Sequence, residues 1–253
     1  MHKNNLAIIL SGGQETRFDE EIPKQFFHIN NKTIIENSVQ KFLNTNLFKK
    51  ILIVSHKTFV NKTKKIFNNS NVEVIEGGST RQESVYKGLN KAKEFNPENV
   101  LIHDSVRPFV TDKLIKEILN KLETSDGVVP ALNIYDSVRY FDKKKYEDLQ
   151  RNNLKLIQTP QGFKFNSIKD AHDQYKEQTF TDDSIIFFKY NKNIIIINGE
   201  KFNFKITTKN DYKLGKLLFE RINMNDIRIG SGFDVHKFKK GNTLTIFGVN
   251  IPF

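Results

Sequence analysis

The chain has 253 residues, 38% hydrophobic and 27% charged, a composition typical of a soluble globular protein with one large domain or two small ones. The absence of cysteine excludes disulfide bonds and thiolate chemistry, and apolar runs such as Ile194–Ile197 are far too short to cross a bilayer. The formal net charge is +11. Because the lysines are scattered, we attribute this charge to compositional bias or to attraction of polyanionic small substrates, with nucleic-acid binding as an alternative.

The first predicted element is a buried strand at Leu6–Leu10, too short for the core of a signal peptide, so a cytoplasmic location is expected. It leads into the small-residue turn Ser11–Gly13 and then a polar loop that contains Arg17 and Lys24. A buried strand followed by glycines and cations is how an α/β sheet binds phosphate at its carboxyl edge. The spacing matches neither a P-loop nor a dinucleotide-binding fingerprint, so the loop predicts a phosphate site of another kind.

Strands and helices then alternate along the chain. Buried strands are predicted at 50–55, 72–75, 100–102 and 127–132, and helices at 33–43, 57–67, 81–95 and 111–122. This order predicts an α/β fold with a doubly wound, mainly parallel sheet, whose ligand-binding loops follow the carboxyl ends of its strands.

The alternation stops at 133–160, a charged segment without glycine that we interpret as a two-stranded arm projecting from the domain. Further helices at 166–175, 182–190 and 210–221, and strands at 194–197 and 204–207, complete a first domain of residues 1–221. A linker is predicted at 222–226. Residues 227–253 are too few to bury a core, so they are either an appendage of the first domain or the beginning of a second.

Two more loops at the predicted carboxyl edge carry polar side chains. Glu76–Ser84 contains a glycine pair and short hydroxyl groups, which suit either contacts with a base edge or a tight turn with a helix cap. Asp104 ends a strand, where a carboxylate commonly holds a metal–phosphate complex or a sugar hydroxyl; pairing with Arg107 is the alternative. His103 lacks ligand-spaced partners and is interpreted as structural. The run Thr181–Asp183 is expected to cap the following helix.

The order of these motifs resembles one family closely. Between Leu6 and Arg221 the chain is similar to the 2-C-methyl-D-erythritol 4-phosphate cytidylyltransferases of non-mevalonate isoprenoid synthesis, in the segments SGGQETRF, PKQF, EGGSTRQES, HDSVRP, RNNLKLIQTPQ, FTDDS and NFKITT. The resemblance implies a Rossmann-like nucleotidyltransferase that transfers cytidylyl from CTP to methylerythritol phosphate and releases pyrophosphate. It also implies Mg²⁺ bound mainly to the CTP phosphates, and a homodimer in which the arm crosses to the partner's site.

The resemblance also implies roles for individual residues. Arg17 and Lys24 would be catalytic and stabilise the α-phosphate of CTP in the transition state. CTP would be bound by Gly12, Gly13, Gly78, Ser79, Ser84 and Asp104, with Asp104 also near the metal and the second substrate. Methylerythritol phosphate would be bound by Ser137, Arg151, Thr181 and Lys205, the first two acting in the partner's site.

Three positions depart from the family's usual residues. Glu15 replaces a glycine beside the triphosphate, Ser79 stands where aspartate is frequent, and Ser137 stands where threonine is common. A carboxylate that pointed at the phosphates would repel them, so we expect Glu15 to point outwards or to meet Mg²⁺.

The tail RIGSGFDVHKF…FGVNIPF resembles the first strands of the 2-C-methyl-D-erythritol 2,4-cyclodiphosphate synthases, so the chain resembles a bifunctional fusion cut short within an α+β cyclase domain. Asp234 and His236 match two ligands of that family's zinc-type metal site, whose third ligand is expected further along the chain. Two ligands make a poor zinc site. We therefore expect no cyclase (lyase) activity from this chain alone, and expect it only in a longer chain.

Two alternatives remain at this point. Another nucleotidyltransferase of the same fold, acting on a sugar or polyol phosphate, shares the first glycine loop, whereas RNNLKLIQTPQ, FTDDS and NFKITT favour methylerythritol phosphate. A basic nucleic-acid-binding protein predicts salt-sensitive affinity for oligonucleotides and no turnover. We expect neither a nucleic acid nor a membrane as a partner.

Overall fold

A computed structural model of the chain describes residues 4–12, 22–142, 145–190, 193–223, 243–246 and 249–252. The chain divides into two compact units, Met1–Glu220 and Arg221–Phe253, and each is described by itself. Among the described residues, no helix combines the length and the apolar character needed to span a bilayer.

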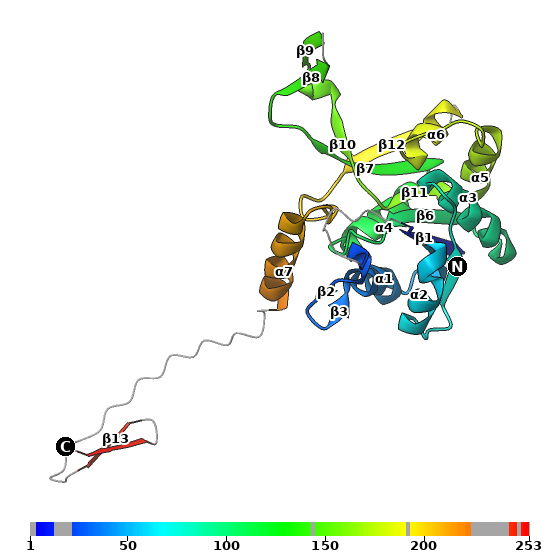
Figure 1. The fold of residues 1–253 in the computed structure, drawn as a ribbon. Coiled ribbons are helices and arrows are strands. Elements are labelled where there is room, and N and C mark those ends of the chain that lie inside the picture. The colour runs from blue at the N-terminus through cyan, green and yellow to red at the C-terminus, as the bar shows by residue number, and fades with distance from the viewer. Residues whose placement is uncertain are drawn as a thin grey trace. The chain divides into compact units, whose positions relative to one another are not determined.

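An eight-stranded sheet runs through the first unit (Figure 1). Its strands are β1 (Asn5–Ser11), β4 (Phe48–Ser55), β5 (Val72–Glu76), β6 (Asn99–Asp104), β7 (Gly127–Asn133), β10 (Lys155–Ile157), β11 (Gln161–Lys164) and β12 (Ile194–Asn198). They follow the order β10-β7-β11-β6-β1-β4-β5, and β12 pairs with β7. The pairs among β5, β4, β1 and β6, and the pair β7–β12, are parallel, whereas β10 and β11 are antiparallel to their neighbours. The predicted mainly parallel sheet is confirmed.

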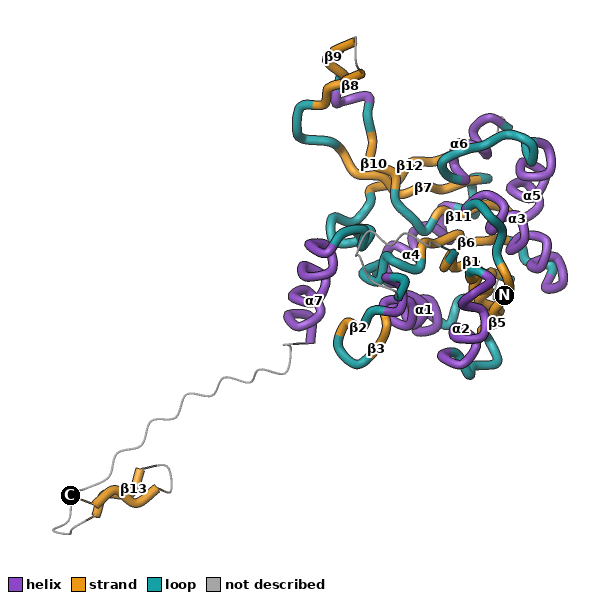
Figure 2. Tube along the Cα trace, in the orientation of Figure 1, coloured by secondary structure: helices purple, strands orange, loops and turns teal. Residues whose placement is uncertain are grey.

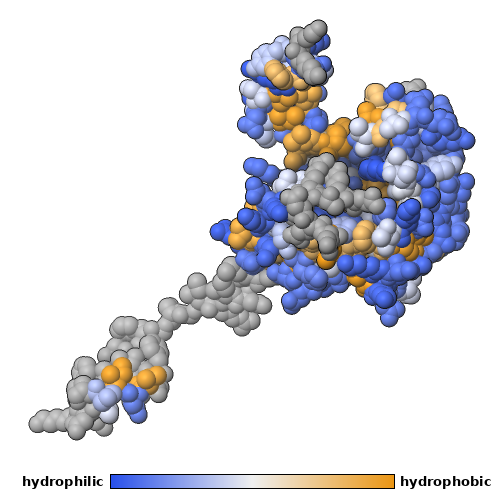
Figure 3. Space-filling view, in the orientation of Figure 1, coloured by the Kyte–Doolittle hydropathy of each residue, from blue (hydrophilic) through white to orange (hydrophobic). Residues whose placement is uncertain are grey.

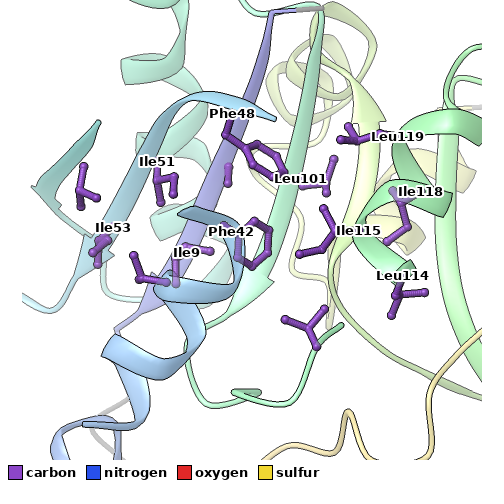
Figure 4. Packing of buried hydrophobic residues seen from close by; sticks show 14 of the residues in the cluster. Ile9, Phe42, Phe48, Ile51, Ile53, Leu101, Leu114, Ile115, Ile118 and Leu119 are labelled. Carbon is purple, nitrogen blue, oxygen red and sulfur yellow. The ribbon is translucent and has the colours of Figure 1, made fainter. Parts of the chain in front are cut away.

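Helices cover both faces of this sheet. One face carries α1 (Ile34–Thr45), α2 (Val60–Ile66) and α4 (Asp112–Lys121), and the other carries α3 (Arg81–Ala92), α5 (Phe165–Gln174) and α6 (Asp183–Lys189). Side chains alternate across a strand, so Ala7 and Ile9 of β1 enter the first cluster while Ile8 enters the second. Figure 4 shows part of the first cluster, where Phe42 of α1 and Ile115 of α4 lie against the sheet. Burying each such apolar side chain stabilises the fold by about 1.5–3 kcal/mol.

A third cluster lies where the chain leaves β6. Near the N-terminus lie the 3₁₀ helix η1 (Lys24–Phe26) and the short paired strands β2 (His28–Ile29) and β3 (Lys32–Thr33). The third cluster joins β2 and the first residue of α1 to α7 (Lys209–Asn223). Its buried members are Ile29, Ile34, Val106, Phe109 and Ile206. The cluster fixes the loop after β6 and the segment before α7 beside each other, which matters for the site below.

The predicted helix starts have clear capping contacts. The Thr111 side chain accepts a hydrogen bond from the backbone N–H of Leu114, and Asp182 does the same for Ile185. Thr80 caps α3 in this way through the N–H of Glu83. The predicted helices at 57–67 and 81–95 each include a 3₁₀ segment, η2 (Lys57–Phe59) and η3 (Lys93–Phe95).

Two expectations about strands were wrong or incomplete. Residues 204–207 form no strand, because Phe204 stacks on Phe109 and Ile206 enters the third cluster instead of joining the sheet. The antiparallel strand β11 is not predicted by the pattern, because it has only four residues and includes Gly162. A Cβ atom at Gly162 would lie 2.3 Å from Ile118 of α4, so the strand needs glycine to pass beneath that helix.

The arm between β7 and β11 is a hairpin of β8 (Val138–Asp142) and β9 (Lys145–Leu149), followed by the 3₁₀ helix η4 (Arg151–Asn153) and β10. Figures 1 and 2 show the hairpin standing out from the sheet, as predicted. Figure 3 shows hydrophobic side chains on the arm and at its base. In the second unit, β13 (Thr243–Ile246) and β14 (Val249–Pro252) form an antiparallel pair.

Candidate active site

A cleft of about 380 Å³ opens at the carboxyl ends of the parallel strands. Residues that follow β1, β4, β5 and β6 meet there, as expected for a doubly wound sheet. The lining residues are Leu10, Gly12, Lys24, Gln25, His56, Gly78, Ser79, Thr80, Arg81, Ser84, Asp104, Ser105, Val106 and Lys205.

Many of the predicted site residues therefore come together. Gly12, Lys24, Gly78, Ser79, Ser84, Asp104 and Lys205 all line the cleft. Ser137 and Arg151 instead line a hollow of about 270 Å³ on the arm. Thr181, which precedes α6, is not among the lining residues of the cleft. Gly13, Glu15, Arg17, Asp234 and His236 lie outside the described residues.

Lys24 belongs to η1 and is only 5% exposed. The turn is closed by the backbone N–H groups of Phe26 and Phe27, which donate to Pro23 and Lys24. Gln25, the next residue, donates from Nε2 to the carbonyl of Ser11 over 3.4 Å. This contact fixes η1 at the end of β1. Lys24 therefore reaches the cleft from a short helix that is anchored to the sheet.

The glycine turn after β5 is held by its own side chains. Ser84 Oγ accepts from the N–H of Gly78 at 3.0 Å and donates to the carbonyl of Thr80 at 2.8 Å. Ser79 donates from both its N–H and its hydroxyl to Glu83, each over 2.7 Å. A Cβ atom at Gly78 would lie 2.4 Å from the Glu83 side chain. The segment is thus a tight turn with a helix cap, which is the second alternative derived from its sequence.

Asp104 is the charged centre of the cleft. Its carboxylate is 3.1 Å from Lys205 Nζ, 3.5 Å from Arg107 Nε and 3.8 Å from Arg81 Nε. Burial by itself raises the pKa of Asp104, but these positive charges outweigh it and hold the pKa far below its usual range. The carboxylate therefore stays ionised, and the pairing with Arg107, which was the alternative interpretation of its sequence, is one of three ion pairs.

Arg81 is a cleft residue that the sequence analysis missed. Its Nη2 lies 2.8 Å from the carboxylate of Asp183, which is fully buried at the start of α6 and also contacts His172 at 3.2 Å. Burial opposes the charge of Arg81, yet Asp183 and Asp104 raise its pKa. Asp182 has the predicted capping role, whereas Asp183 pairs with Arg81. The sequence signal that could have identified Arg81 is its position directly after the helix cap Thr80, at the carboxyl edge of the sheet.

His103 is fully buried behind Asp104 and is structural, as predicted. Its Nε2 lies 3.1 Å from the carbonyl of Arg107 and its Nδ1 lies 3.0 Å from Thr159 Oγ1, which also accepts from the N–H of Asp104. A neutral imidazole that donates from Nε2 and accepts at Nδ1 satisfies all these groups. Burial lowers the pKa of His103 to about 4, in agreement with this neutral form.

The described residues contain no group of three His, Cys, Asp or Glu side chains able to hold a metal ion. Asp104 supplies a carboxylate to the cleft, and its oxygen atoms are of the kind that Mg²⁺ prefers. A single protein carboxylate fits a Mg²⁺ ion that arrives with substrate phosphates better than a resident metal site.

Comparisons with known proteins agree on one family. Residues 6–221 match the family model of 2-C-methyl-D-erythritol 4-phosphate cytidylyltransferase. The protein of that name from Petrotoga mobilis is 39% identical over 222 residues, covering 85% of this chain and 97% of the relative. The bifunctional enzyme IspD/IspF of Pelagibacter ubique is 37% identical over 249 residues, covering 98% of this chain. The chain spans 64% of that relative's length.

Solved structures give the same picture. The bifunctional IspDF of Campylobacter jejuni superposes with a TM-score of 0.74 at 34% identity, covering 99% of this chain and 64% of its own. The 4-diphosphocytidyl-2C-methyl-D-erythritol synthase of Anaerococcus prevotii has a TM-score of 0.76 at 27% identity, covering 87% of this chain and all of its own.

Proposed function

Because the chain belongs to the 2-C-methyl-D-erythritol 4-phosphate cytidylyltransferase family, we propose that it transfers the cytidylyl group of CTP to 2-C-methyl-D-erythritol 4-phosphate. The products are 4-diphosphocytidyl-2-C-methyl-D-erythritol and pyrophosphate. The observation that carries the proposal is the cleft in which Lys24, Arg81 and Lys205 gather with Asp104 at the carboxyl edge of the sheet. Cations at this edge suit two polyanionic substrates.

The proposed step is an in-line displacement at phosphorus. An oxygen of the methylerythritol phosphate group attacks the α-phosphorus of CTP, and the bond to the bridging oxygen of the β-phosphate breaks as pyrophosphate leaves. Negative charge accumulates on the α-phosphate oxygens, so fixed cations near them lower the barrier. We assign this role to Lys24 and Arg17. The backbone of Gly12 and Gly13 would approach the nucleotide closely.

We further propose that Gly78, Ser79 and Ser84 contact the cytosine. Ser84 and Ser79 already bond within the turn, so backbone groups of the turn would make a large share of these contacts. When bound with CTP, Mg²⁺ would neutralise phosphate charge, and Asp104 is the residue that would hold it.

Lys205 is proposed to bind the phosphate of methylerythritol phosphate, together with Thr181. Ser137 and Arg151 lie on the arm, and we assign them to the site of a partner subunit in a homodimer. Arg151 Nη1 donates to the carbonyl of Tyr135 at 2.6 Å, a contact that fixes the arginine to the arm itself.

The last part of the chain supports a second proposal. The bifunctional relative aligns with 98% of the chain, whereas the family model ends at residue 221. We infer that residues 227–253 correspond to the start of a 2,4-cyclodiphosphate synthase domain, with Asp234 and His236 as ligands of a divalent metal such as Zn²⁺ in a longer protein. Two such ligands alone do not complete a catalytic zinc site.

Pyrophosphate release tests the proposed function. The chain is incubated with CTP, Mg²⁺ and a panel of alcohol phosphates that includes methylerythritol phosphate and common sugar and polyol phosphates. We expect release to be fastest with methylerythritol phosphate and to need CTP. Release with another phosphate alone would reassign the acceptor, and no release together with salt-sensitive oligonucleotide binding would favour a nucleic-acid-binding protein.

A further inference from the structure

The residue proposed to hold the second substrate, Lys205, lies on a segment without regular secondary structure. Residues 199–207 connect β12 to α7 and contain no helix or strand. Lys205 is also 41% exposed, so its own side chain is not fixed by burial. The position of its ammonium group, 3.1 Å from Asp104, must therefore depend on what holds this loop.

The side chain of Gln158, which is about 40 residues earlier in the chain, binds the beginning of that loop. It is 4% exposed and directly follows β10, the strand that returns from the arm. Its Nε2 donates to the carbonyls of Glu200 and Asn203 at 2.9 and 3.2 Å, and its Oε1 accepts from the N–H of Glu200 at 3.0 Å. One amide side chain thus satisfies three backbone groups of the loop.

The loop is shaped to receive this side chain. A Cβ atom at Gly199 would lie 2.4 Å from Gln158 Oε1, so the close approach requires glycine. The carbonyl of Asn203 also accepts from Arg107 Nη1 at 2.9 Å, and Arg107 in turn lies 3.5 Å from Asp104. Gln158 therefore belongs to a continuous set of contacts that ends at the carboxylate facing Lys205.

We propose that Gln158 is a positioning residue: it fixes the 199–205 loop so that Lys205 is held at the phosphate of the second substrate. The inference rests on the proposed function of Lys205. Because Gln158 directly follows the arm, the same contacts tie the placement of the arm's return strand to the cleft. Two other contacts hold the loop on either side of Lys205: Phe204 stacks on Phe109, and the N–H of Ile206 donates to the carbonyl of Val106. Loss of the Gln158 contacts should therefore shift the loop without releasing it.

The test variant is Gln158→Met in the full chain, which keeps the length of the side chain and removes both hydrogen-bonding groups. The KM for methylerythritol phosphate should rise by about tenfold or more, while the KM for CTP changes by less than about twofold, because a small displacement of a binding group is costly. Hydrogen–deuterium exchange of peptides covering 199–207 should also become faster, since Glu200 loses its acceptor.

Asn99→Leu is the matched control. Asn99 is 1% exposed and donates to Asn5 at the opposite end of β6, so its loss removes a buried amide contact away from the cleft. We expect it to lower the thermal stability comparably and to leave both KM values and the exchange of 199–207 unchanged. An equal rise of both KM values in the two variants would overturn the positioning role.

Gly199→Ala provides a second approach if Gln158→Met does not fold. The methyl group is added on the loop, and it displaces the Gln158 amide from its contacts with Glu200. Unchanged KM values and unchanged exchange in a folded variant would overturn the inference while leaving the proposed function intact. A wild-type chain without turnover would overturn the proposed function; exchange of 199–207 then still decides whether Gln158 fixes the loop.

Discussion

Lys24 is buried to 95% and lines the cleft in which the phosphates of CTP are proposed to bind. We predict that Lys24→Ala lowers kcat by about 10²-fold or more, as when a fixed charge partner of a transition state is removed, with little loss of stability. Lys62→Ala is the control, because Lys62 lies over the neighbouring Phe26 ring at 4.5 Å without lining the cleft. A near-normal rate for Lys24→Ala would remove this residue from the catalytic assignment.

For single residues, the sequence predicts a place in the cleft where that place follows from adjacent residues in the chain. Lys24 and Asp104 stand beside a proline-containing loop and a strand end, where cations and carboxylates are informative. Arg81 was missed because its role depends on Asp183, which is distant in sequence and reaches it only through the packing of α3 and α6 on one sheet face.

His103 gives a prediction for pH. Burial lowers its pKa to about 4 in the folded chain, whereas an unfolded histidine titrates near 6.5. Between these values the unfolded state binds more protons, so the free energy of unfolding must fall as the pH falls from 7 to 5. The histidine accounts for about 2 kcal/mol of that decrease.

Urea denaturation of the wild type and of His103→Asn at pH 7 and pH 5 measures this difference. The variant lacks the titrating imidazole, so its stability should depend less on pH by about that amount. An identical pH dependence in the two proteins would mean that folding does not lower the pKa of this imidazole.

The arm carries exposed aromatic side chains that favour contact with a second copy of the chain. A two-stranded hairpin is marginal in water, yet this one exposes Phe141 by 78% and Tyr146 by 67%, and Tyr135, just before β8, is 80% exposed. We predict that the chain forms dimers through these side chains, and that Phe141→Ser with Tyr146→Ser shifts the population to monomers in sedimentation experiments. Glu147→Ser, on the same hairpin, should leave the dimer intact.

If the arm contributes Arg151 to the active site of the partner subunit, a second prediction follows for the arm. Arg17→Ala and Arg151→Ala subunits should each be inactive, and mixing them should restore part of the activity, because each heterodimer keeps one site with both arginines. Verified heterodimers without any recovery would argue that the arm serves assembly alone.

Elements differ in how well the sequence foretells them. The long strands and capped helices follow from periodicity and N-cap chemistry, as at Thr111. β11 depends on a glycine that lets it pass beneath α4, and the Phe204–Thr207 segment alternates like a strand but buries its apolar side chains in the third cluster. Both outcomes are decided by tertiary packing, which local patterns do not contain.

For the whole molecule, the alternating strands and helices of the sequence predict the layered architecture. They also predict the edge of the sheet at which the cleft lies. They do not determine that β11 inserts between β6 and β7, because such an insertion changes the sheet order without changing the local pattern. The net charge of +11 likewise acquires meaning only with the cleft, where lysine and arginine side chains surround one carboxylate.

The tail allows the last prediction. Its hairpin of β13 and β14 has two strands, and Val249 and Ile251 are 63% and 45% exposed, so it buries too little apolar surface to fold alone. If the tail is the beginning of a second domain, a chain ending at Asp226 should keep its melting temperature and its rate of pyrophosphate release within about twofold. If the tail is an appendage of the first domain, the shortened chain should melt at a clearly lower temperature, because packed apolar surface is lost. Thermal unfolding and steady-state kinetics of the two chains, side by side, distinguish these outcomes.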